Sequence, residues 1–361
     1  MNTPVSVRPA DPQAPAGRPG HRAGRAVGAA ACALVLAALA GVCVGALPLP
    51  PVAVLATLAD RVAAVVGGHV PGGLEGAQAA VLLQLRLPRV VLGALVGAGL
   101  AVSGAAYQGV FRNPLADPYL LGAAAGAGLG ATLVIAYLPG QSIGPVGVVP
   151  LAAFAGAVVG VGSAVLLGTA AGRGTATLLL AGVAVASFLA AAQTLVQQQN
   201  TDDLQQVYSW LLGQLGRASW SDVLLVLPYL GVAFVVLLLC GRPLDVLAVG
   251  DDEARSLGVH PGRLRLLVVL AASLAAAAAV AVSGLIGFVG LVVPHIARRF
   301  VGGSNARLLP VALLIGGAFL VLADLVARVV LAPAELPIGV VTAFVGAPFF
   351  AGLLWTGTRR A

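Results

Sequence analysis

The chain has 361 residues, of which 59% are hydrophobic and only 9% are charged, and its mean hydropathy is +1.01. Soluble domains carry about 25% charged residues, so the composition excludes an ordinary soluble fold and predicts an integral membrane protein. All 20 basic residues are arginine, and without lysine the chain cannot form a phosphate-binding loop of the G-x-x-x-x-G-K-[ST] type. The three cysteines each lie in an apolar run, which indicates neither a disulfide framework nor a cysteine metal site.

Membrane spans follow from the apolar runs, because a hydrocarbon core of about 30 Å needs roughly 20 apolar residues in a helix. In chain order, ten spans are predicted at about 27–47, 90–111, 119–138, 151–171, 174–201, 223–241, 266–283, a short span between 284 and 297, 308–328 and 337–357. Eight spans is the alternative count. Residues 1–25 contain five prolines and four arginines and predict a disordered cytoplasmic tail, so 26–361 form the membrane domain.

The arginines predict the orientation of this all-α bundle. An even number of spans places both termini on one side of the membrane. With the N-terminus inside, fifteen arginines lie inside and five outside, and because basic loops stay cytoplasmic, both termini are predicted to be cytoplasmic. The same rule explains the net charge of +7 better than nucleic-acid binding does. The five arginines predicted outside are Arg61, Arg86, Arg89, Arg217 and Arg328.

Two of these outer arginines, Arg86 and Arg89, belong to the segment LRLPR, which enters the second span from outside. Basic residues at a helix start oppose the helix dipole as well as the charge bias of the loops. They are either snorkelling anchors at the membrane surface or a cationic patch for acidic residues of an extracytoplasmic partner. Arg328 follows Asp324 by four residues, and an i,i+4 ion pair between them is compatible with either role.

Two predicted cytoplasmic segments differ from simple connections between helices, one by its prolines and the other by its length. The second span ends in RNPLADP, residues 112–118, where two prolines with Asn and Asp predict a rigid turn that is either a bare connection or part of a gate. The loop 242–263 is long, since helix–helix connections usually take about 2–8 residues. Within it, acids at the start and a glycine at the end of 251–258 predict a short helix, which is either solvated or inserted into a cytosolic partner.

Two other classes of protein remain as alternatives. Residues 140–144, GQSIG, match the nucleophile elbow G-x-S-x-G of serine hydrolases, which needs a strand-to-helix turn and acidic and histidine partners. Because the motif stands in a short connection between apolar segments, a coincidence is favoured over an intramembrane serine protease. The second alternative is an ion-coupled carrier or channel, although the spans lack the central acids that such carriers usually hold.

Five motifs stand in order along the chain: LRLPR, SGAAYQGVFRNPLADPYLLG, LAVGDDEARSLGV, SGLIGFVGLVVPHIARR and ELPIGVVTAFVGAPFF. In this combination, over roughly residues 77–357, the chain resembles the permease subunit of ABC importers for cobalamin, ferric siderophores and haem. The resemblance implies an ABC importer type II permease fold, in which ten-helix subunits pair around a central pathway. Two cytosolic ATPase subunits attach on one side, and a substrate-binding protein docks on the other.

The resemblance also implies roles for the residues at matching positions. The docking site for the binding protein carries over to Arg86, Arg89 and Arg328. The cytoplasmic gate carries over to Asn113 and Leu115, and to Thr175 through the less specific local sequence GRGTAT. The ATPase coupling site resembles an E-A-x-x-x-G signature and carries over to Gly250, Glu253, Ala254, Leu257 and Gly258. Arg255 stands in place of the second alanine of that signature.

We therefore predict a transport subunit without enzymatic activity, which moves a metal chelate from a binding protein into the cytoplasm. Ferric siderophore is the first candidate for the cargo by this resemblance, followed by haem and cobalamin. No cofactor or metal site is expected in this chain, since ATP and Mg²⁺ would be bound by the separate ATPase. The expected partners are an ATPase dimer, an extracytoplasmic binding protein, a second copy or a homologous permease, and the lipid of the bacterial inner membrane, but no nucleic acid.

Overall fold

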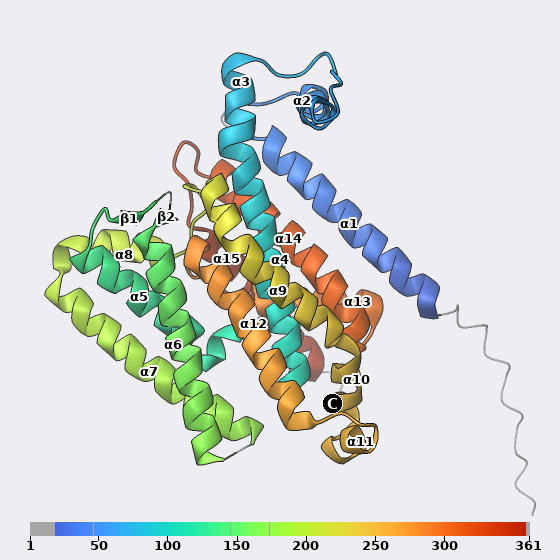
Figure 1. Cartoon of the computed structure of the whole chain (residues 1–361), viewed down its shortest axis with the longest axis vertical. Coiled ribbons are helices and arrows are strands. Elements are labelled where there is room, and N and C mark those ends of the chain that lie inside the picture. Colours follow the sequence, from blue (N-terminus) through green and yellow to red (C-terminus); the bar gives the residue numbers. More distant parts are fainter. Residues whose placement is uncertain (1–18, 46, 145, 173, 359–361) are drawn as a thin grey trace, which may run out of the picture.

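A computed structural model describes residues 19–45, 47–144, 146–172 and 174–358 as a bundle of helices (Figure 1). At the predicted spans lie α1 Pro19–Cys43, α4 Leu87–Phe111, α5 Ala123–Tyr137, α6 Val148–Ala171, α7 Thr175–Gln199, α9 Trp220–Leu239, α12 Pro261–Ser283, α13 Val289–Val301, α14 Asn305–Val329 and α15 Ile338–Thr358. The other helical elements are α2 Pro51–Ala64, α3 Gly76–Ala80, the π-helical η1 Val81–Arg86, η2 Pro118–Leu121, η3 Thr201–Asp203, α8 Leu204–Leu211, α10 Gly241–Val249 and α11 Asp251–Ser256. Two short antiparallel strands, β1 Ser142–Ile143 and β2 Val146–Gly147, pair Ser142 with Gly147.

The predicted helical membrane fold is confirmed, whereas the count of ten spans is not. In the described part of the chain, seven helices are long and apolar enough to cross a membrane, and α5 and part of α15 are shorter apolar helices. The predicted short eighth span corresponds to α13, which has 13 residues. Helix α1 begins at Pro19, inside the predicted tail, and residues 1–18 lie outside the described residues. The sequence analysis did not anticipate α2.

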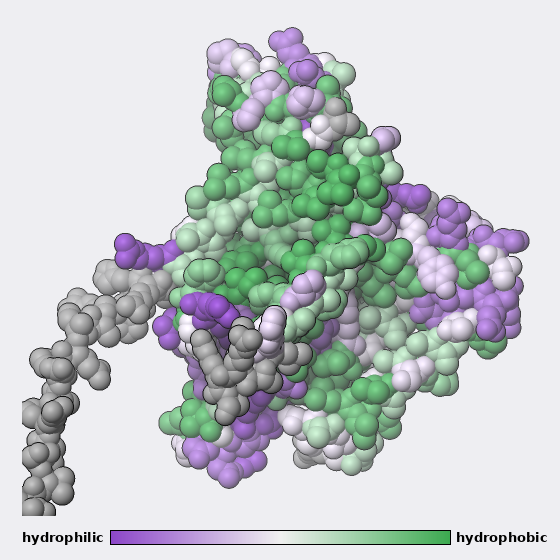
Figure 2. All heavy atoms as spheres, turned by 180° about the vertical axis from the view of Figure 1, so that it is seen from behind, coloured by the Kyte–Doolittle hydropathy of each residue, from purple (hydrophilic) through white to green (hydrophobic). Residues whose placement is uncertain are grey.

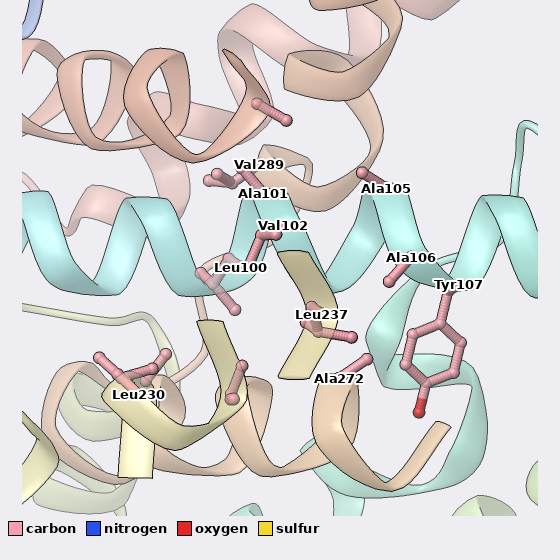
Figure 3. Packing of buried hydrophobic residues seen from close by; sticks show 14 of the residues in the cluster. Leu100, Ala101, Val102, Ala105, Ala106, Tyr107, Leu230, Leu237, Ala272 and Val289 are labelled. Atoms are coloured by element: carbon pink, nitrogen blue, oxygen red, sulfur yellow. The ribbon is translucent and has the colours of Figure 1, made fainter. Parts of the chain in front are cut away.

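Helix α4 forms the centre of the bundle. It continues α3 and η1 without a break, so that one helical rod runs over the 36 residues Gly76–Phe111. In Figure 3 its residues Leu100 and Tyr107 lie beside Leu230 of α9 and Ala272 of α12, within one buried apolar cluster. Burial on nearly every side explains why this helix is apolar all round instead of amphipathic.

Small residues allow the helices around α4 to approach closely. A Cβ atom placed on Gly97 would overlap the carbonyl oxygen of Gly316 in α14, and one on Gly104 would overlap that of Gly290 in α13. Gly126 and Gly130 of α5 behave in the same way, because a Cβ on Gly126 would overlap the carbonyl oxygen of Gly156 in α6 and one on Gly130 would overlap that of Ala152. Such backbone contact provides van der Waals packing where lipid supplies no hydrophobic drive for helix association.

The two ends of the bundle carry the polar residues. The arginine end holds Arg86, Arg89 and Arg328, near η1 and the end of α14, whereas the α11 end holds α10, α11 and the end of α4 (Figure 1). Figure 2 shows hydrophilic residues at the top and the bottom of the molecule and at one side, with hydrophobic residues spread between them. This distribution fits a protein whose middle faces lipid.

Candidate functional site

At the arginine end, Arg86 is buried, with 8% of its surface exposed. Its guanidinium donates hydrogen bonds to the carbonyl oxygens of Val42 at 2.8 Å and Cys43 at 3.3 Å, and also to that of Leu47. Basic side chains commonly satisfy the free carbonyl groups at a helix C-terminus, and α1 ends at Cys43. Arg86 therefore fixes the end of α1 and the chain that leaves it.

Arg89 joins α4 to α14 and to the segment before α15. Its Nε and Nη2 donate to the carboxylate of Asp324 over 2.8–3.1 Å, and Nη1 and Nη2 donate to Glu335 at 2.9 and 2.8 Å. Arg328 forms the predicted i,i+4 ion pair with Asp324 at 3.1 Å and also donates to the carbonyl oxygen of Gly41 at 2.9 Å. Asp324 is thus shared between two arginines.

Arg86, Arg89 and Arg328 form an arginine cluster at this end, and each of its guanidinium groups has partners within the chain. The side chain of Asp324 is only 3% exposed, whereas that of Glu335 is 45% exposed and is the accessible member of the network. Hydrogen bonding to Arg89 holds the pKa of Glu335 below its usual range, so Glu335 is charged at neutral pH. Sequence reasoning missed Glu335, which stands at the start of the motif ELPIG.

At the α11 end, the predicted gate residues Asn113 and Leu115 form an exposed turn directly after α4. Arg112 adopts the left-handed conformation with φ 49°, and its N–H bonds the carbonyl oxygen of Gln108, which ends the helix. The Asn113 Oδ1 atom then accepts the N–H of Leu115 at 2.9 Å, and the Leu115 side chain is 60% exposed. The rigid turn predicted from the sequence is therefore present.

A cavity of about 850 Å³ lies next to this turn. It is enclosed by the end of α4, the α6–α7 connection and the start of α12, and its lining includes Phe111, Thr175, Leu178, Arg265 and Val269. Thr175, the third predicted gate residue, is the first residue of α7. The structure brings Thr175 and Phe111 to this cavity, whereas Asn113 and Leu115 are not among the residues that line it.

The predicted coupling residues lie on and around α11, as the turn-then-helix pattern indicated. Ala254 is fully buried, whereas Glu253 and Leu257 are exposed, Leu257 to 67%. Gly258 ends the helix with φ 81°, a left-handed conformation that favours glycine, and Val259 N–H bonds the Ala254 carbonyl oxygen at 2.9 Å. A Cβ on Gly250 would overlap the Glu253 carboxylate. The buried Ala254 thus fixes a short helix whose residues Asp252, Glu253, Arg255 and Ser256 are exposed to solvent.

Two acids that the sequence analysis did not single out attach this segment to the bundle. Asp245 of α10 caps the first residues of α14, because its carboxylate accepts from Ser304 Oγ at 2.6 Å, from Ala306 N–H at 3.3 Å and from Asn305 N–H. Asp251, the first residue of α11, pairs with Arg112 at 2.6 Å and with Arg265 at 2.7 Å. Nothing local in the sequence reveals these partners, which lie 14 to 139 residues away.

The amino-acid sequence matches a known protein family over most of its length. The model of the FecCD transport family matches residues 33–356, which is nearly the whole chain. The chain belongs to the FecCD transport family. It is thus a multi-pass membrane permease of a transport family, in agreement with its apolar helices.

Relatives and a solved structure agree with the FecCD assignment. The chain is 46% identical over 278 residues to the cobalamin import system permease protein BtuC of Halobacterium salinarum, covering 77% of this chain and 74% of that protein. It is 42% identical over 287 residues to the hemin transport system permease protein HmuU of Yersinia pestis, covering 77% and 83%. A solved structure described as an inward-facing conformation of a metal-chelate type ABC transporter matches with a TM-score of 0.79 at 31% identity, covering 92% and 99%.

The FecCD membership does not favour the serine protease alternative, and neither does the local structure. Ser142 lies exposed in the two-residue strand β1, which turns back into β2. A nucleophile elbow instead requires a turn from a strand directly into a helix. The GQSIG motif is therefore a hairpin turn in this FecCD permease.

Helix α7 of this FecCD permease has an unusual surface. Only 11% of its most apolar stretch of 18 residues is buried within the chain. Its exposed residues are mostly apolar but include the polar Ser187 and Thr194. Gln193 instead faces α5, since a Cβ on Gly128 would lie 2.7 Å from its Oε1. Small and polar residues are typical of helices that pack on another helix or line an aqueous path. The exposed face of α7 is therefore available to lipid or to another helix.

Proposed function

We propose that this chain is the membrane-spanning permease of an ATP-driven ABC importer that carries a metal chelate into the cytoplasm. Ferric siderophore is the first candidate cargo, with haem and cobalamin as the others, in line with the hemin and cobalamin permeases among its relatives. The observation that carries the proposal is the exposed helix α11, held by the buried Ala254, in a chain that matches the FecCD transport family over residues 33–356. Such a helix suits contact with a separate protein that supplies energy.

In this proposal the α11 end faces the cytoplasm and the arginine end faces outward. The basic residues support this orientation, because Arg255, Arg263, Arg298 and Arg307 all lie near the α11 end, and basic loops stay cytoplasmic. Both termini are then cytoplasmic, and the membrane is the bacterial inner membrane. The ATPase subunits bind at Glu253, Leu257 and the neighbouring coupling residues.

A loaded binding protein docks on the arginine cluster with acidic side chains. The exposed carboxylate of Glu335 supports this role, since it marks the position at which a carboxylate meets Arg89. Docking then requires an acidic group of the binding protein to replace Glu335 or to join it. The buried Asp324 keeps the arginines in place during this exchange.

A second permease, either another copy or a homologue, packs against the exposed face of α7 and completes the pathway. The pathway opens to the cytoplasm next to Asn113, Leu115 and Thr175. The described lining of the cavity at Thr175 is mostly apolar, which suits a bulky chelate that must pass without tight binding. ATP binding and hydrolysis on the ATPase subunits move α11 and exchange the outer and inner gates.

The experiment that tests this function is chelate uptake by proteoliposomes that contain the chain with its ATPase and with binding protein added outside. Ferric siderophores, haem and cobalamin are supplied separately, and we expect uptake of one class that requires ATP inside and the binding protein outside. A variant of the ATPase that cannot hydrolyse ATP is the control. Uptake by the chain alone, without ATP, would instead identify a carrier or channel and overturn the proposal.

A further inference from the structure

One carboxylate at the α11 end joins three helices. Asp251 Oδ1 accepts a hydrogen bond from Arg112 Nη2 at 2.6 Å and another from Arg265 Nη2 at 2.7 Å. Arg112 is the residue that ends α4, and Arg265 lies in the first two turns of α12. Asp251 itself begins α11. A single side chain therefore connects the helix that is exposed to a partner with the ends of two long helices of the bundle.

Arg112 is held firmly at its other contacts. Its guanidinium also donates to the carbonyl oxygen of Leu247 in the last turn of α10, and its backbone N–H bonds Gln108 of α4. The next residue is Asn113, whose side chain closes the turn to Leu115. No flexible segment separates the contact at Asp251 from the exposed turn 113–115, so a displacement of Arg112 must also move that turn.

The two arginines stand at the end of α4 and in α12, and both helices contribute residues to the lining of the cavity of about 850 Å³. Arg265 lines that cavity from α12, and Arg112 directly follows Phe111, which lines it from α4. Asp251 therefore joins the end of α4 to α12 beside this cavity. Asp245 attaches α10 to the start of α14. The segment formed by α10 and α11 is therefore also held to the bundle by a contact that does not involve Asp251.

We propose that Asp251 is a positioning residue that transmits the movement of α11 to the gate, by joining Arg112 at the end of α4 to Arg265 of α12. The inference rests on the proposed transport function and adds the residue through which the ATPase movement reaches the turn 113–115. The side chains of Asp251, Arg112 and Arg265 are 32%, 39% and 22% exposed. Partly exposed ion pairs contribute little to stability, so the expected defect lies in coupling and not in folding.

The test compares Asp251→Asn with Asp252→Asn in the complete complex of permease, ATPase and binding protein in proteoliposomes. Asp252 is a matched control, because it lies on the same short helix and, among the described residues, its ion pair is with Arg255, three residues later on the exposed surface. For Asp251→Asn we expect the ATPase to copurify and to hydrolyse ATP, while chelate uptake per ATP falls by about tenfold, a usual size for coupling between distant sites. Asp252→Asn should keep the wild-type ratio.

A second set of variants separates transmission from local structure. Arg112→Gln and the double variant Arg112→Gln with Asp251→Asn should show the same loss as Asp251→Asn, since all three break the same connection. Asp251→Glu keeps the charge and should restore part of the uptake per ATP. If Asp251→Asn does not fold, the comparison rests on Arg112→Gln against Asp252→Asn.

Three results would overturn the inference. The first is an unchanged uptake per ATP in Asp251→Asn and Arg112→Gln. The second is loss of ATPase copurification in Asp251→Asn, because Asp251 would then contact the ATPase directly. The third is a loss in the double variant equal to the product of the two single losses, because the residues would then act independently. Failure of the proposed function is distinguishable from all of these, since the wild-type complex would then show no ATP-dependent uptake.

Discussion

Charged side chains are buried at one end of this permease and partly exposed at the other. At the arginine end, Arg86, Arg89 and Arg328 are nearly buried, and their charges are satisfied by Asp324, Glu335 and helix carbonyl groups. At the α11 end, the ion pairs around Asp251 are partly exposed, and Glu253 and Leu257 face solvent. The first arrangement favours a fixed structure, whereas the second leaves charged and apolar side chains exposed on the surface.

The largest expected effect comes from removing the acid shared by two arginines. Asp324→Ala leaves Arg89 without its buried partner and Arg328 without its ion pair, and breaking a buried pair usually costs about 3–5 kcal/mol. We expect a much lower thermal denaturation midpoint of the purified protein in detergent. Glu335→Gln, at the half-exposed position on the same arginine, is the control and should cost less than about 1 kcal/mol. Equal losses in both variants would contradict the difference between buried and accessible charge.

A smaller loss is expected at the α11 end from Asp245→Ala. This change removes the cap of α14, and a lost helix cap costs about 1–2 kcal/mol. Thermal denaturation should show the difference, with Asp252→Ala on the neighbouring helix as the control that stays near the wild type. A wild-type midpoint in Asp245→Ala would show that α10 does not depend on this attachment.

The accessible carboxylate at the arginine end should affect docking more than folding. Glu335→Gln frees Arg89 for an acidic group of the binding protein, so we expect affinity for the binding protein to rise by about 1.5- to 5-fold, the range of a partly exposed ion pair. Arg89→Gln should lower it. Surface plasmon resonance on the permease in nanodiscs measures both. Unchanged affinity in both variants would exclude Arg89 from the docking site.

The smallest effect concerns pH. Arginine partners lower the pKa values of Glu335 and Asp251, so the stability that each pair contributes is present above the ordinary carboxyl pKa of about 4 and is lost as the pH falls through the lower folded-state value. The contribution of these groups is therefore complete and constant between pH 6 and 8, and they should cause no change of the denaturation midpoint with pH in this range. The difference between the wild type and Glu335→Gln should shrink only below about pH 4. A difference that disappears near pH 6 would contradict this assignment.

Features that depend on neighbouring residues could be predicted from the sequence. The break after Ser283 follows from Gly284, which adopts φ 70°, and the short helix α11 follows from its acidic start and glycine end. The Asp324–Arg328 pair follows from helical spacing. In each case the interaction that decides the structure lies within a few residues.

Features that depend on residues far apart in the sequence could not be predicted from it. Glu335 contacts Arg89 from 246 residues away, and no local pattern indicates this pairing. Helix α2 also escaped prediction, because its 14 residues begin at Pro51, directly after Pro48 and Pro50, and are too short for a span. Its position depends on Val54 packing into a cluster with Leu82 and Val90 of the central rod, a contact that only the folded chain provides.

The uninterrupted helix from Gly76 to Phe111 has a mechanical consequence. At about 1.5 Å per residue, its 36 residues extend well beyond a bilayer core of about 30 Å. Arg86 and Arg89 belong to its first part, and Arg112 follows its last residue. A continuous helix of this kind passes a tilt from one end to the other, so in the proposed importer it would connect the docking of cargo on one side of the membrane with the use of ATP on the other.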